Sequence, residues 1–131
     1  MNPSPYRVGI DIVLVKQIQE SIERFGKRFL NRVFTMEEQT YCRSHSSALT
    51  VAQSFASRFA AKEATIKVLR PEKFWGDWRE IEVRRKQDGS CDIILHKEAK
   101  ALAESRSIAA LSLSMSHEAE YATAIVIADF E

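Results

Sequence analysis

Residues 59–67 read FAAKEATIK, a stretch that predicts a helix. At about 100° per residue, Phe59, Ile66 and Glu63 fall within roughly 60° of one another, so a carboxylate lies at the edge of an apolar stripe. A charge beside a hydrophobic face must be paired, metal-bound or at the rim of a site. This helix is therefore the first candidate for chemistry.

The helix extends on both sides of this stretch. It covers about residues 48–69, contains no interior glycine or proline, and ends before Pro71, which cannot continue a helix. The following residues 71–80 predict an irregular loop that holds Trp75 and Trp78. The apolar stripe of the long helix consists of Ala52, Phe55, Phe59, Ile66 and Leu69.

A strand and a helix are predicted before the long helix. Prolines oppose helix in residues 1–7, which predict a short arm. The β-branched residues of the segment 8–15 favour a strand. Apolar spacings of three and four predict a helix over about residues 16–31, which Gly26 weakens or splits in two.

The remaining elements mix helices and strands. Thr35 and Glu38 match a capping box, which begins a short helix running to about residue 43. Because strands and helices do not alternate regularly, the predicted fold class is α+β, with a largely antiparallel sheet packed against the long helix. The further predicted elements are strands at 81–85, 91–95, 111–116 and 121–128, a hairpin turn at Asp88-Gly89, and a helix at 97–105.

The composition is that of an ordinary globular protein. The 131 residues are 45% apolar and 28% charged with a net charge of +1, which predicts one domain over residues 1–131 and no global attraction to nucleic acid or membranes. No segment approaches the roughly 20 apolar residues that cross a bilayer, and we see no signal-peptide pattern. Cys42 and Cys91 lack the spacing of a zinc site and are predicted to be reduced thiols in a cytoplasmic protein.

Asp11 interrupts an apolar strand within the sequence Gly9-Ile10-Asp11-Ile12. An acid in such a strand is costly unless something compensates it. It either caps a turn or faces solvent, or it is a metal ligand. A small number of carboxylate oxygens suits Mg²⁺, which keeps several waters and also takes substrate phosphates.

Glu63 and Lys67 are four residues apart on the long helix. They are either a helix-stabilising ion pair or a second metal ligand beside a phosphate contact. Arg58 and Lys62 lie on the neighbouring flank, so one helix would present a carboxylate and up to three cations, a combination suited to a metal–phosphate ligand. The sequence contains no phosphate-loop or dinucleotide-binding motif, so side chains and a metal must bind any phosphate.

Histidines and a basic helix face are further candidates. His117 follows the alternating segment 111–116 and is either structural or solvated, or a phosphate donor or acid–base group; His45 and His96 have weaker claims. The charges of the first helix form either a solvated face or a docking surface for an acidic partner. They are Arg24, Lys27, Arg28 and Arg32, which cover roughly 140° of arc if the helix persists.

Taken together, these residues resemble the holo-acyl-carrier-protein synthase family of 4′-phosphopantetheinyl transferases. Four segments carry the resemblance in the family's order and span nearly the whole chain. They are residues 9–12, GIDI; 34–38, FTMEE; 58–64, RFAAKEA, with Lys67; and 114–117, SMSH.

The resemblance implies the 4′-phosphopantetheinyl transferase fold in a compact homotrimer with active sites between protomers. It implies that the 4′-phosphopantetheine arm of coenzyme A is transferred to a serine of an apo acyl carrier protein, with Mg²⁺, releasing 3′,5′-ADP. By the same resemblance Asp11 and Glu63 are the Mg²⁺ ligands, and Lys67 contacts the phosphate under attack. The other implied site residues are Arg58, Lys62, Lys67 and His117 for coenzyme A, and Arg24, Arg28 and Arg32 for docking of the carrier protein.

The chain departs from the family pattern after Lys67. Relatives commonly continue with an alanine and a Gly-Thr-Gly type loop, whereas residues 68–75 read VLRPEKFW. The altered segment 68–78 indicates a divergent member. One hypothesis is that it serves a carrier other than the fatty-acid one, such as a polyketide carrier; the sequence leaves the choice between the two carrier types open. Two alternatives stay open: a domain that binds coenzyme A or the carrier without transfer, and a small Mg²⁺-dependent phosphohydrolase that acts without a carrier.

Overall fold

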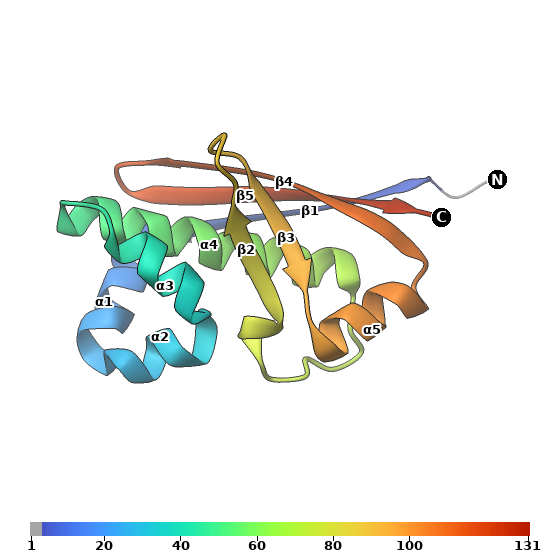
Figure 1. Cartoon of the computed structure of the whole chain (residues 1–131), viewed down its shortest axis with the longest axis horizontal. Coiled ribbons are helices and arrows are strands. Elements are labelled where there is room, and N and C mark those ends of the chain that lie inside the picture. The colour runs from blue at the N-terminus through green and yellow to red at the C-terminus, as the bar shows by residue number, and fades with distance from the viewer. Residues whose placement is uncertain (1–3) are drawn as a thin grey trace.

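A computed structural model describes residues 4–131 and places one long helix, α4 (Ala48–Leu69), between a sheet and a layer of short helices and a hairpin (Figure 1). The sheet has the strand order β1-β5-β4, and both strand pairs are antiparallel. The architecture confirms the predicted α+β class. The elements are β1 Tyr6–Leu14, α1 Val15–Phe25, α2 Lys27–Val33, α3 Met36–Arg43, α4 Ala48–Leu69, the 3-10 helix η1 Trp78–Glu80, β2 Ile81–Arg85, β3 Cys91–Leu95, α5 Lys97–Ser105, β4 Ile108–Glu118 and β5 Tyr121–Phe130.

The long helix has the predicted bounds. Ser47 caps its N-terminus, because the Ser47 side chain accepts a hydrogen bond from the backbone N–H of Thr50. At its other end Arg70 adopts a left-handed conformation with φ 50°, and Pro71 follows. A left-handed residue followed by proline is a common way to end a helix.

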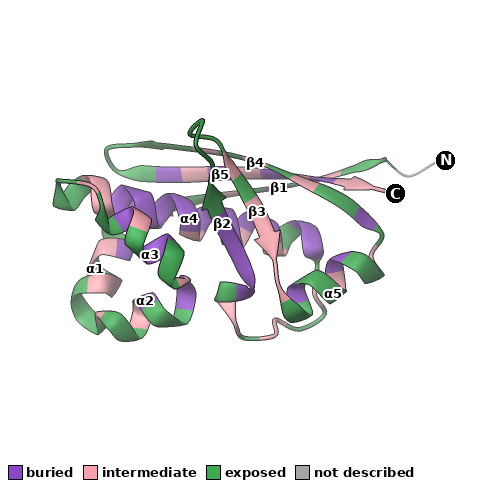
Figure 2. Cartoon of the chain, viewed as in Figure 1, coloured by how far each residue is buried: buried purple, intermediate pink, exposed green. Residues whose placement is uncertain are grey.

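The core surrounds α4 rather than covering a single stripe of it. The sheet packs on one side of the helix, while α1, α3 and β2 contact its other sides, as the buried residues in Figure 2 show. The predicted stripe was therefore incomplete, because neighbouring elements bury residues on several sides of α4, and these include polar residues such as Ser57 and Thr65. Phe59 and Ile66 of that stripe are only half-buried, whereas the fully buried residues include Ala56, Ala60, Ala61, Ala64 and Val68.

Gly9 sets the distance between the sheet and α4. A Cβ built on Gly9 would lie 2.3 Å from the backbone oxygen of Ala64 and 3.1 Å from a methyl group of Val68. No real side chain tolerates such a contact with backbone, so β1 and α4 approach closely only because residue 9 lacks a side chain.

The predicted helix over residues 16–31 is split in two. Gly26 has φ 55° and ψ −132°, a conformation that ends α1 and begins α2. Glycine adopts this conformation without the clash that a Cβ would cause. Arg24 therefore lies on α1 while Arg28 and Arg32 lie on α2, so the four basic residues do not share one continuous helical arc.

Three strands are longer than predicted, and one of them, β5, continues to Phe130. β1 begins at Tyr6, inside the predicted arm of residues 1–7, because its backbone pairs with β5 from Tyr6 opposite Asp129 onward. Residues 1–3 of the predicted arm lie outside the described residues. β4 continues to Glu118, so His117 lies within the strand and pairs with Ala122 rather than following the strand's end. The predicted hairpin β2–β3, helix α5 and capping box of α3 are confirmed.

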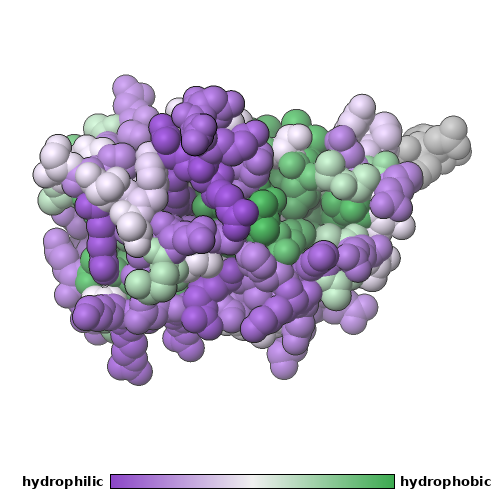
Figure 3. All heavy atoms as spheres, viewed as in Figure 1, coloured by the Kyte–Doolittle hydropathy of each residue, from purple (hydrophilic) through white to green (hydrophobic). Residues whose placement is uncertain are grey.

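The two sides of the molecule differ in polarity. Figure 3 shows that the side carrying the short helices is mostly hydrophilic, with an apolar area over the strands to the right of the hairpin. The other face of the sheet carries a row of exposed apolar residues on β1: Tyr6, Val8, Ile10, Ile12 and Leu14. Among residues 4–131 no helix is both long and apolar enough to cross a bilayer.

The Gly9 contact gives a stability prediction. Gly9→Ala should lower the apparent free energy of unfolding by about 3 kcal/mol or more, because the added methyl group meets backbone that cannot move independently of α4. The measurement is chemical denaturation at fixed protein concentration.

Gly26→Ala is the control for this prediction. Its Cβ meets no atom within 4 Å, so its cost of roughly 1–2 kcal/mol is backbone strain at positive φ. A Gly9→Ala protein as stable as the wild type would contradict the inferred contact between β1 and α4.

Candidate active site

Two carboxylates face each other between β1 and α4. Asp11 pairs in the sheet with Ala124, whose side chain is buried against α4, so Asp11 points to the helix. Glu63 lies on α4 and is half-buried. Burial, followed by the charge of Asp11, raises the pKa of the Glu63 carboxyl, and Lys67 partly opposes this shift. The two acids are thus close enough to repel each other.

Lys67 bonds to Asp11 rather than to Glu63. Its ammonium group lies 3.2 Å from Asp11 Oδ1 and donates a 2.6 Å hydrogen bond to the backbone oxygen of Ile10. Within residues 4–131, Glu63 forms no salt bridge. Of the two alternatives for these residues, the ion pair between Glu63 and Lys67 is therefore not formed, and Lys67 instead connects α4 to β1. Lys67 is half exposed, so its ammonium group can also reach a ligand.

A cavity of about 400 Å³ opens beside the two carboxylates. Its walls are polar near Asp11 and Glu63 and apolar where Phe59 of α4 and Phe29 of α2 line it. A phosphate or a hydroxyl group could approach the carboxylates here, while the aromatic rings limit access of water from one side.

The carboxylate pair fits a hard divalent cation. Within the described chain there is no group of three or more histidine, cysteine or acidic side chains that could hold a metal. Two carboxylates alone are nevertheless a suitable donor set for Mg²⁺, which usually keeps several waters and binds through one or two carboxylates plus substrate phosphates. A metal at this site would depend on a phosphate ligand to complete its coordination.

A second cavity, of about 200 Å³, lies on the other flank of α4. Arg58 of α4, His117 of β4 and Arg85 of β2 line it, and no acidic residue is among its lining residues from the described part of the chain. Arg58 is almost fully buried, its guanidinium group lies 4.6 Å from the Tyr41 ring, and Arg58 Nε has no hydrogen-bond partner within residues 4–131. An unpaired buried donor in a cationic cavity favours binding of an anion.

Lys62 is not available to a ligand. Its side chain is fully buried, and its ammonium group donates to Glu38 at 2.9 Å, to Trp78 O at 3.3 Å and to Ile81 O. An ammonium group has three hydrogens, and these three acceptors use all of them. We therefore withdraw Lys62 from the predicted coenzyme A contacts, because the β2 strand and α3 cover it.

The predicted site residues fall into two groups on opposite flanks of α4. Arg58 and Glu63 are five positions apart, which places them roughly 140° from each other around the helix. Asp11 lies on β1 and His117 on β4, and β5 separates these two edge strands. The fold therefore joins Asp11, Glu63 and Lys67 on one side, and Arg58 with His117 on the other.

The basic residues predicted to dock a partner are exposed on α1 and α2. Arg28 and Arg32 line a cavity of about 260 Å³ together with Phe25 and Phe29. Phe25 is 50% exposed, which is unusual for an aromatic residue without a partner. Arg24 lies outside this cavity and over the Phe25 ring at 5.2 Å. Phe29 lines both this cavity and the cavity beside Glu63. The basic surface formed by Arg24, Arg28 and Arg32 therefore adjoins the carboxylate cavity.

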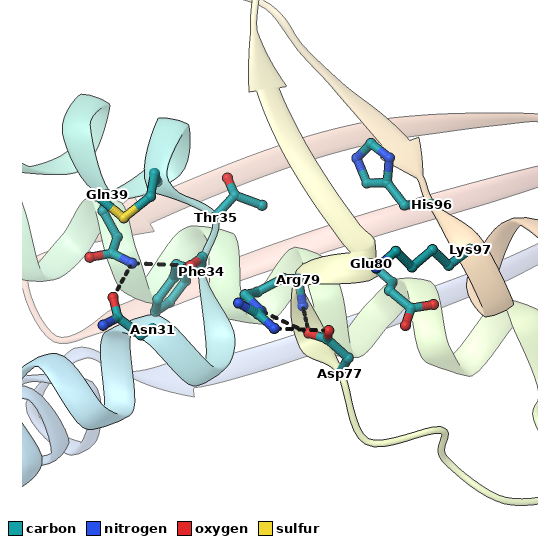
Figure 4. Close-up of a pocket in the computed structure, with 10 residues that line it drawn as sticks. Asn31, Phe34, Thr35, Gln39, Asp77, Arg79, Glu80, His96 and Lys97 are labelled. Atoms are coloured by element: carbon teal, nitrogen blue, oxygen red, sulfur yellow. Dashed lines mark hydrogen bonds and ion pairs between the residues drawn. The ribbon is translucent and has the colours of Figure 1, made fainter.

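Another cavity, of about 500 Å³, lies between the α2–α3 junction and η1 (Figure 4). It contains none of the predicted site residues. Its prominent polar groups bond to one another: Arg79 pairs with Asp77, and the Gln39 amide donates to Asn31 and to Phe34 O. We assign the chemistry to the cavities beside Glu63 and Arg58, because within residues 4–131 Glu63 forms no salt bridge and Arg58 Nε has no hydrogen-bond partner.

The altered segment 68–78 forms an aromatic cluster beside the carboxylate cavity. Trp78 stacks on Phe59 with ring centroids 5.2 Å apart, and Phe74 contacts both tryptophans of the segment. Because Phe59 also lines the cavity beside Glu63, this cluster supports one wall of that cavity.

Sequence reasoning missed several residues of the anion cavity. Tyr41 comes from α3, while Arg85 comes from the β2–β3 hairpin. No local pattern marks either residue, because only the folding of the hairpin over α4 brings them to Arg58. His45, which had a weak claim as part of a serine-rich loop, also lines this cavity and contacts the Tyr41 ring edge.

The profile of the 4′-phosphopantetheinyl transferase superfamily matches residues 7–126 of the chain. A protein of Koribacter versatilis named holo-[acyl-carrier-protein] synthase is 42% identical over 120 residues, which cover 91% of this chain and 94% of the relative. A Chlamydia trachomatis protein of the same name is 40% identical over 126 residues, covering 95% of this chain and 99% of the relative.

Solved structures show the same fold. The Chronobacterium ammoniagenes ACPS–CoA complex matches with a TM-score of 0.83 at 30% identity, covering 98% of this chain and 99% of that chain. Helicobacter pylori holo-[acyl-carrier-protein] synthase in complex with coenzyme A matches with a TM-score of 0.78 at 29% identity, covering 94% of this chain and 100% of that chain.

The fold, with a long helix seated on an antiparallel sheet and a carboxylate pair between them, is that of a phosphopantetheinyl transferase. The chain belongs to the 4′-phosphopantetheinyl transferase superfamily, and its similar relatives are holo-[acyl-carrier-protein] synthases. The predicted family, fold and enzyme class are confirmed. The roles of the individual site residues stay predictions.

Proposed function

We propose that this protein transfers the 4′-phosphopantetheine group of coenzyme A to a serine of an apo acyl carrier protein, as its holo-[acyl-carrier-protein] synthase relatives are named to do. The observation that carries the proposal is the Asp11–Glu63 pair with Lys67 bonded to Asp11, at the edge of a cavity. Phosphoryl transfer needs this kind of site, because positioning and charge neutralisation do most of the work.

The residues divide the reaction between them. Asp11 and Glu63 would hold Mg²⁺, which, when bound, neutralises charge that develops on the pyrophosphate. Glu63, or a water that it orients, accepts the proton of the carrier serine. The serine oxygen then forms a bond to the β-phosphorus, and the bond from that phosphorus to the bridging oxygen breaks. Lys67 stabilises the negative charge of the departing 3′,5′-ADP and can donate a proton to it.

The cavity around Arg58 would receive the nucleotide part of coenzyme A. That part carries phosphate groups, and the cavity offers two arginines, two histidines and an unpaired Nε donor. Solved relatives named as complexes with coenzyme A support this assignment. Arg58 and His117 would thus contact coenzyme A, while Lys62 would not.

We propose that the active site is shared between protomers of a homotrimer. Within one chain the carboxylate pair and the Arg58 cavity lie on opposite flanks of α4, so one molecule of coenzyme A would bridge two chains. The exposed apolar row of β1 supports the existence of such an interface, since large apolar patches usually mark contact sites. A cyclic arrangement would join one flank of each chain to the other flank of its neighbour.

The carrier protein would dock on the basic surface of α1 and α2. Arg28 and Arg32 surround the exposed Phe25, which gives an apolar contact within a ring of positive charge. An acidic carrier would associate quickly with such a surface, in a salt-dependent way. Because Phe29 lines both cavities, the serine of a carrier docked on this surface would lie near Glu63. Arg24 would contribute charge from α1.

Several broader assignments belong to the same proposal. Residues 1–131 would form one transferase domain, a view supported by the family match over residues 7–126. The free Cys42 and Cys91 support a reducing, cytoplasmic location. The physiological carrier would belong to fatty-acid or polyketide synthesis, and the aromatic segment 68–78 motivates the polyketide alternative.

The first prediction of the proposed function is that the phosphopantetheine group is transferred to a carrier protein. With coenzyme A, Mg²⁺ and a panel of apo carrier proteins, at least one carrier should gain one phosphopantetheine group, measured by intact-protein mass spectrometry. Glu63→Gln should lower the rate at least about 1,000-fold, since the amide keeps the shape but loses a metal-facing charge. The Glu63→Gln protein should unfold at nearly the wild-type temperature.

Four outcomes would change the assignment. Binding of coenzyme A without any transfer would favour a binding domain. Hydrolysis of coenzyme A without a carrier would favour a phosphohydrolase. Near-wild-type turnover of Glu63→Gln would remove Glu63 from the catalytic residues. Transfer to the fatty-acid carrier alone would exclude the polyketide alternative.

The second prediction tests docking. Arg28→Glu should raise the KM for the carrier about tenfold while leaving the KM for coenzyme A within about twofold, because it reverses a charge that only the carrier meets. The matched control is Lys100→Glu, the same change at an exposed position of α5. Equal carrier KM values for the two variants would exclude Arg28 from the docking surface.

The third prediction tests the shared site by mixing subunits. Glu63→Gln and Arg58→Gln homotrimers should each be strongly impaired. Mixed trimers formed by co-expression should recover activity, with about one quarter of the sites intact under random mixing, because each such site combines two undamaged flanks. If both flanks acted within one chain, every chain would carry a lesion and mixing would restore no activity.

A further inference from the structure

A buried ion pair next to the proposed active site takes no part in the reaction derived above. Lys62 and Glu38 are 2.9 Å apart, and the side chains of both are 0% exposed. Lys62 directly precedes Glu63 on α4, whereas Glu38 comes from the first turn of α3.

Every polar group of the pair has a partner. Glu38 accepts hydrogen bonds from the backbone N–H of Thr35 at 2.8 Å and of Val83 at 2.9 Å, in addition to the bond from Lys62. Lys62 also donates to the backbone oxygens of Trp78 and Ile81. Buried charges are tolerated when they are satisfied in this way, but apolar residues of similar size often stabilise a core equally well. Stability alone therefore does not account for the pair.

The pair fixes α4 against three separate elements. Through Glu38 it connects the helix to the N-terminus of α3 and to β2, and through Trp78 O it connects the helix to η1. On the other side α4 is held by β1, at Gly9 and through Lys67. Contacts from two sides restrict rotation of α4 about its own axis. Contact with β1 alone would leave this rotation free.

Rotation of α4 would directly affect Glu63. A side-chain tip about 6 Å from the helix axis moves about 2 Å when the helix turns by roughly 20°. That displacement equals a whole Mg²⁺–oxygen distance of about 2.0–2.1 Å, and Mg²⁺ demands near-ideal octahedral geometry. The position of Glu63 relative to Asp11 thus depends on how firmly the rotation of α4 is fixed.

We propose that Lys62 and Glu38 are positioning residues that fix the rotation of α4 and so hold Glu63 at the distance from Asp11 that a divalent cation requires. The inference rests on the proposed transferase function and goes beyond it, because it gives a role to two residues that touch neither substrate nor metal. It also explains why a lysine next to the catalytic glutamate is fully buried.

Direct metal binding tests this role. The affinity for Mn²⁺ in the presence of coenzyme A is measured by electron paramagnetic resonance of free Mn²⁺. Lys62→Met should raise the Mn²⁺ dissociation constant at least tenfold, and Glu38→Gln about threefold, because the amide keeps the shape of the side chain but weakens its bond to Lys62. Lys86→Met is the control, since Lys86 forms an exposed pair with Asp92 at 3.5 Å in the β2–β3 hairpin.

Kinetics separate positioning from a general loss of folded enzyme. In Lys62→Met the apparent activation constant for Mg²⁺ should rise, and excess Mg²⁺ should restore most of kcat with an unchanged KM for the carrier. A merely structural role would lower kcat at every Mg²⁺ concentration and leave the activation constant as in the wild type. All assays are run well below the unfolding temperature of each variant.

The outcomes are separable. If Lys62→Met does not fold, Glu38→Gln and the double variant Lys62→Met/Glu38→Leu, which removes both charges of the pair, decide between the possibilities. Folded variants with Mn²⁺ affinity within twofold of the wild type would overturn the positioning role alone. A wild-type protein that binds no Mn²⁺ with coenzyme A would overturn the proposed function together with this inference.

Discussion

At Gly9 the backbone of β1 lies against α4 so closely that a Cβ would come within 2.3 Å of Ala64 O. This contact brings Asp11, two residues further along β1, to the side of the helix where Lys67 bonds to it. The same approach places Glu63 within electrostatic range of Asp11. A bulkier residue at position 9 would separate the two carboxylates, because strand and helix are each rigid over these few residues.

The long helix both builds and divides the candidate site. Glu63 and Lys67 extend toward β1, whereas Arg58 extends toward β4 and the hairpin. One chain therefore contains a carboxylate flank, proposed to bind a metal, and a cationic flank, proposed to bind an anion, and α4 itself keeps the two apart. In the proposed trimer this separation has a function, since each coenzyme A would be bound by two flanks from different chains.

The polar interior of the protein is concentrated around Lys62. A buried ammonium group and a buried carboxylate are costly unless all their hydrogen-bonding groups are satisfied, and here three donors and three acceptors meet these needs. Glu38 combines two tasks, because its carboxylate completes the capping box of α3 and also binds Lys62. The N-terminus of α3 is thereby linked to the rotational position of α4.

Local sequence patterns determined the helix from Ala48 to Leu69, the capping box at Thr35 and the hairpin, because propensity, capping and turn residues act over a few positions. The motif containing Glu63, with Asp11 and His117, also determined the family. Only the tertiary structure decided that Lys62 is buried, that Lys67 bonds to Asp11 and that Tyr41 and Arg85 meet Arg58. Each of these contacts joins residues far apart in the chain. The spacing along α4 fixes which flank a side chain occupies, but no local pattern records which element packs against that flank.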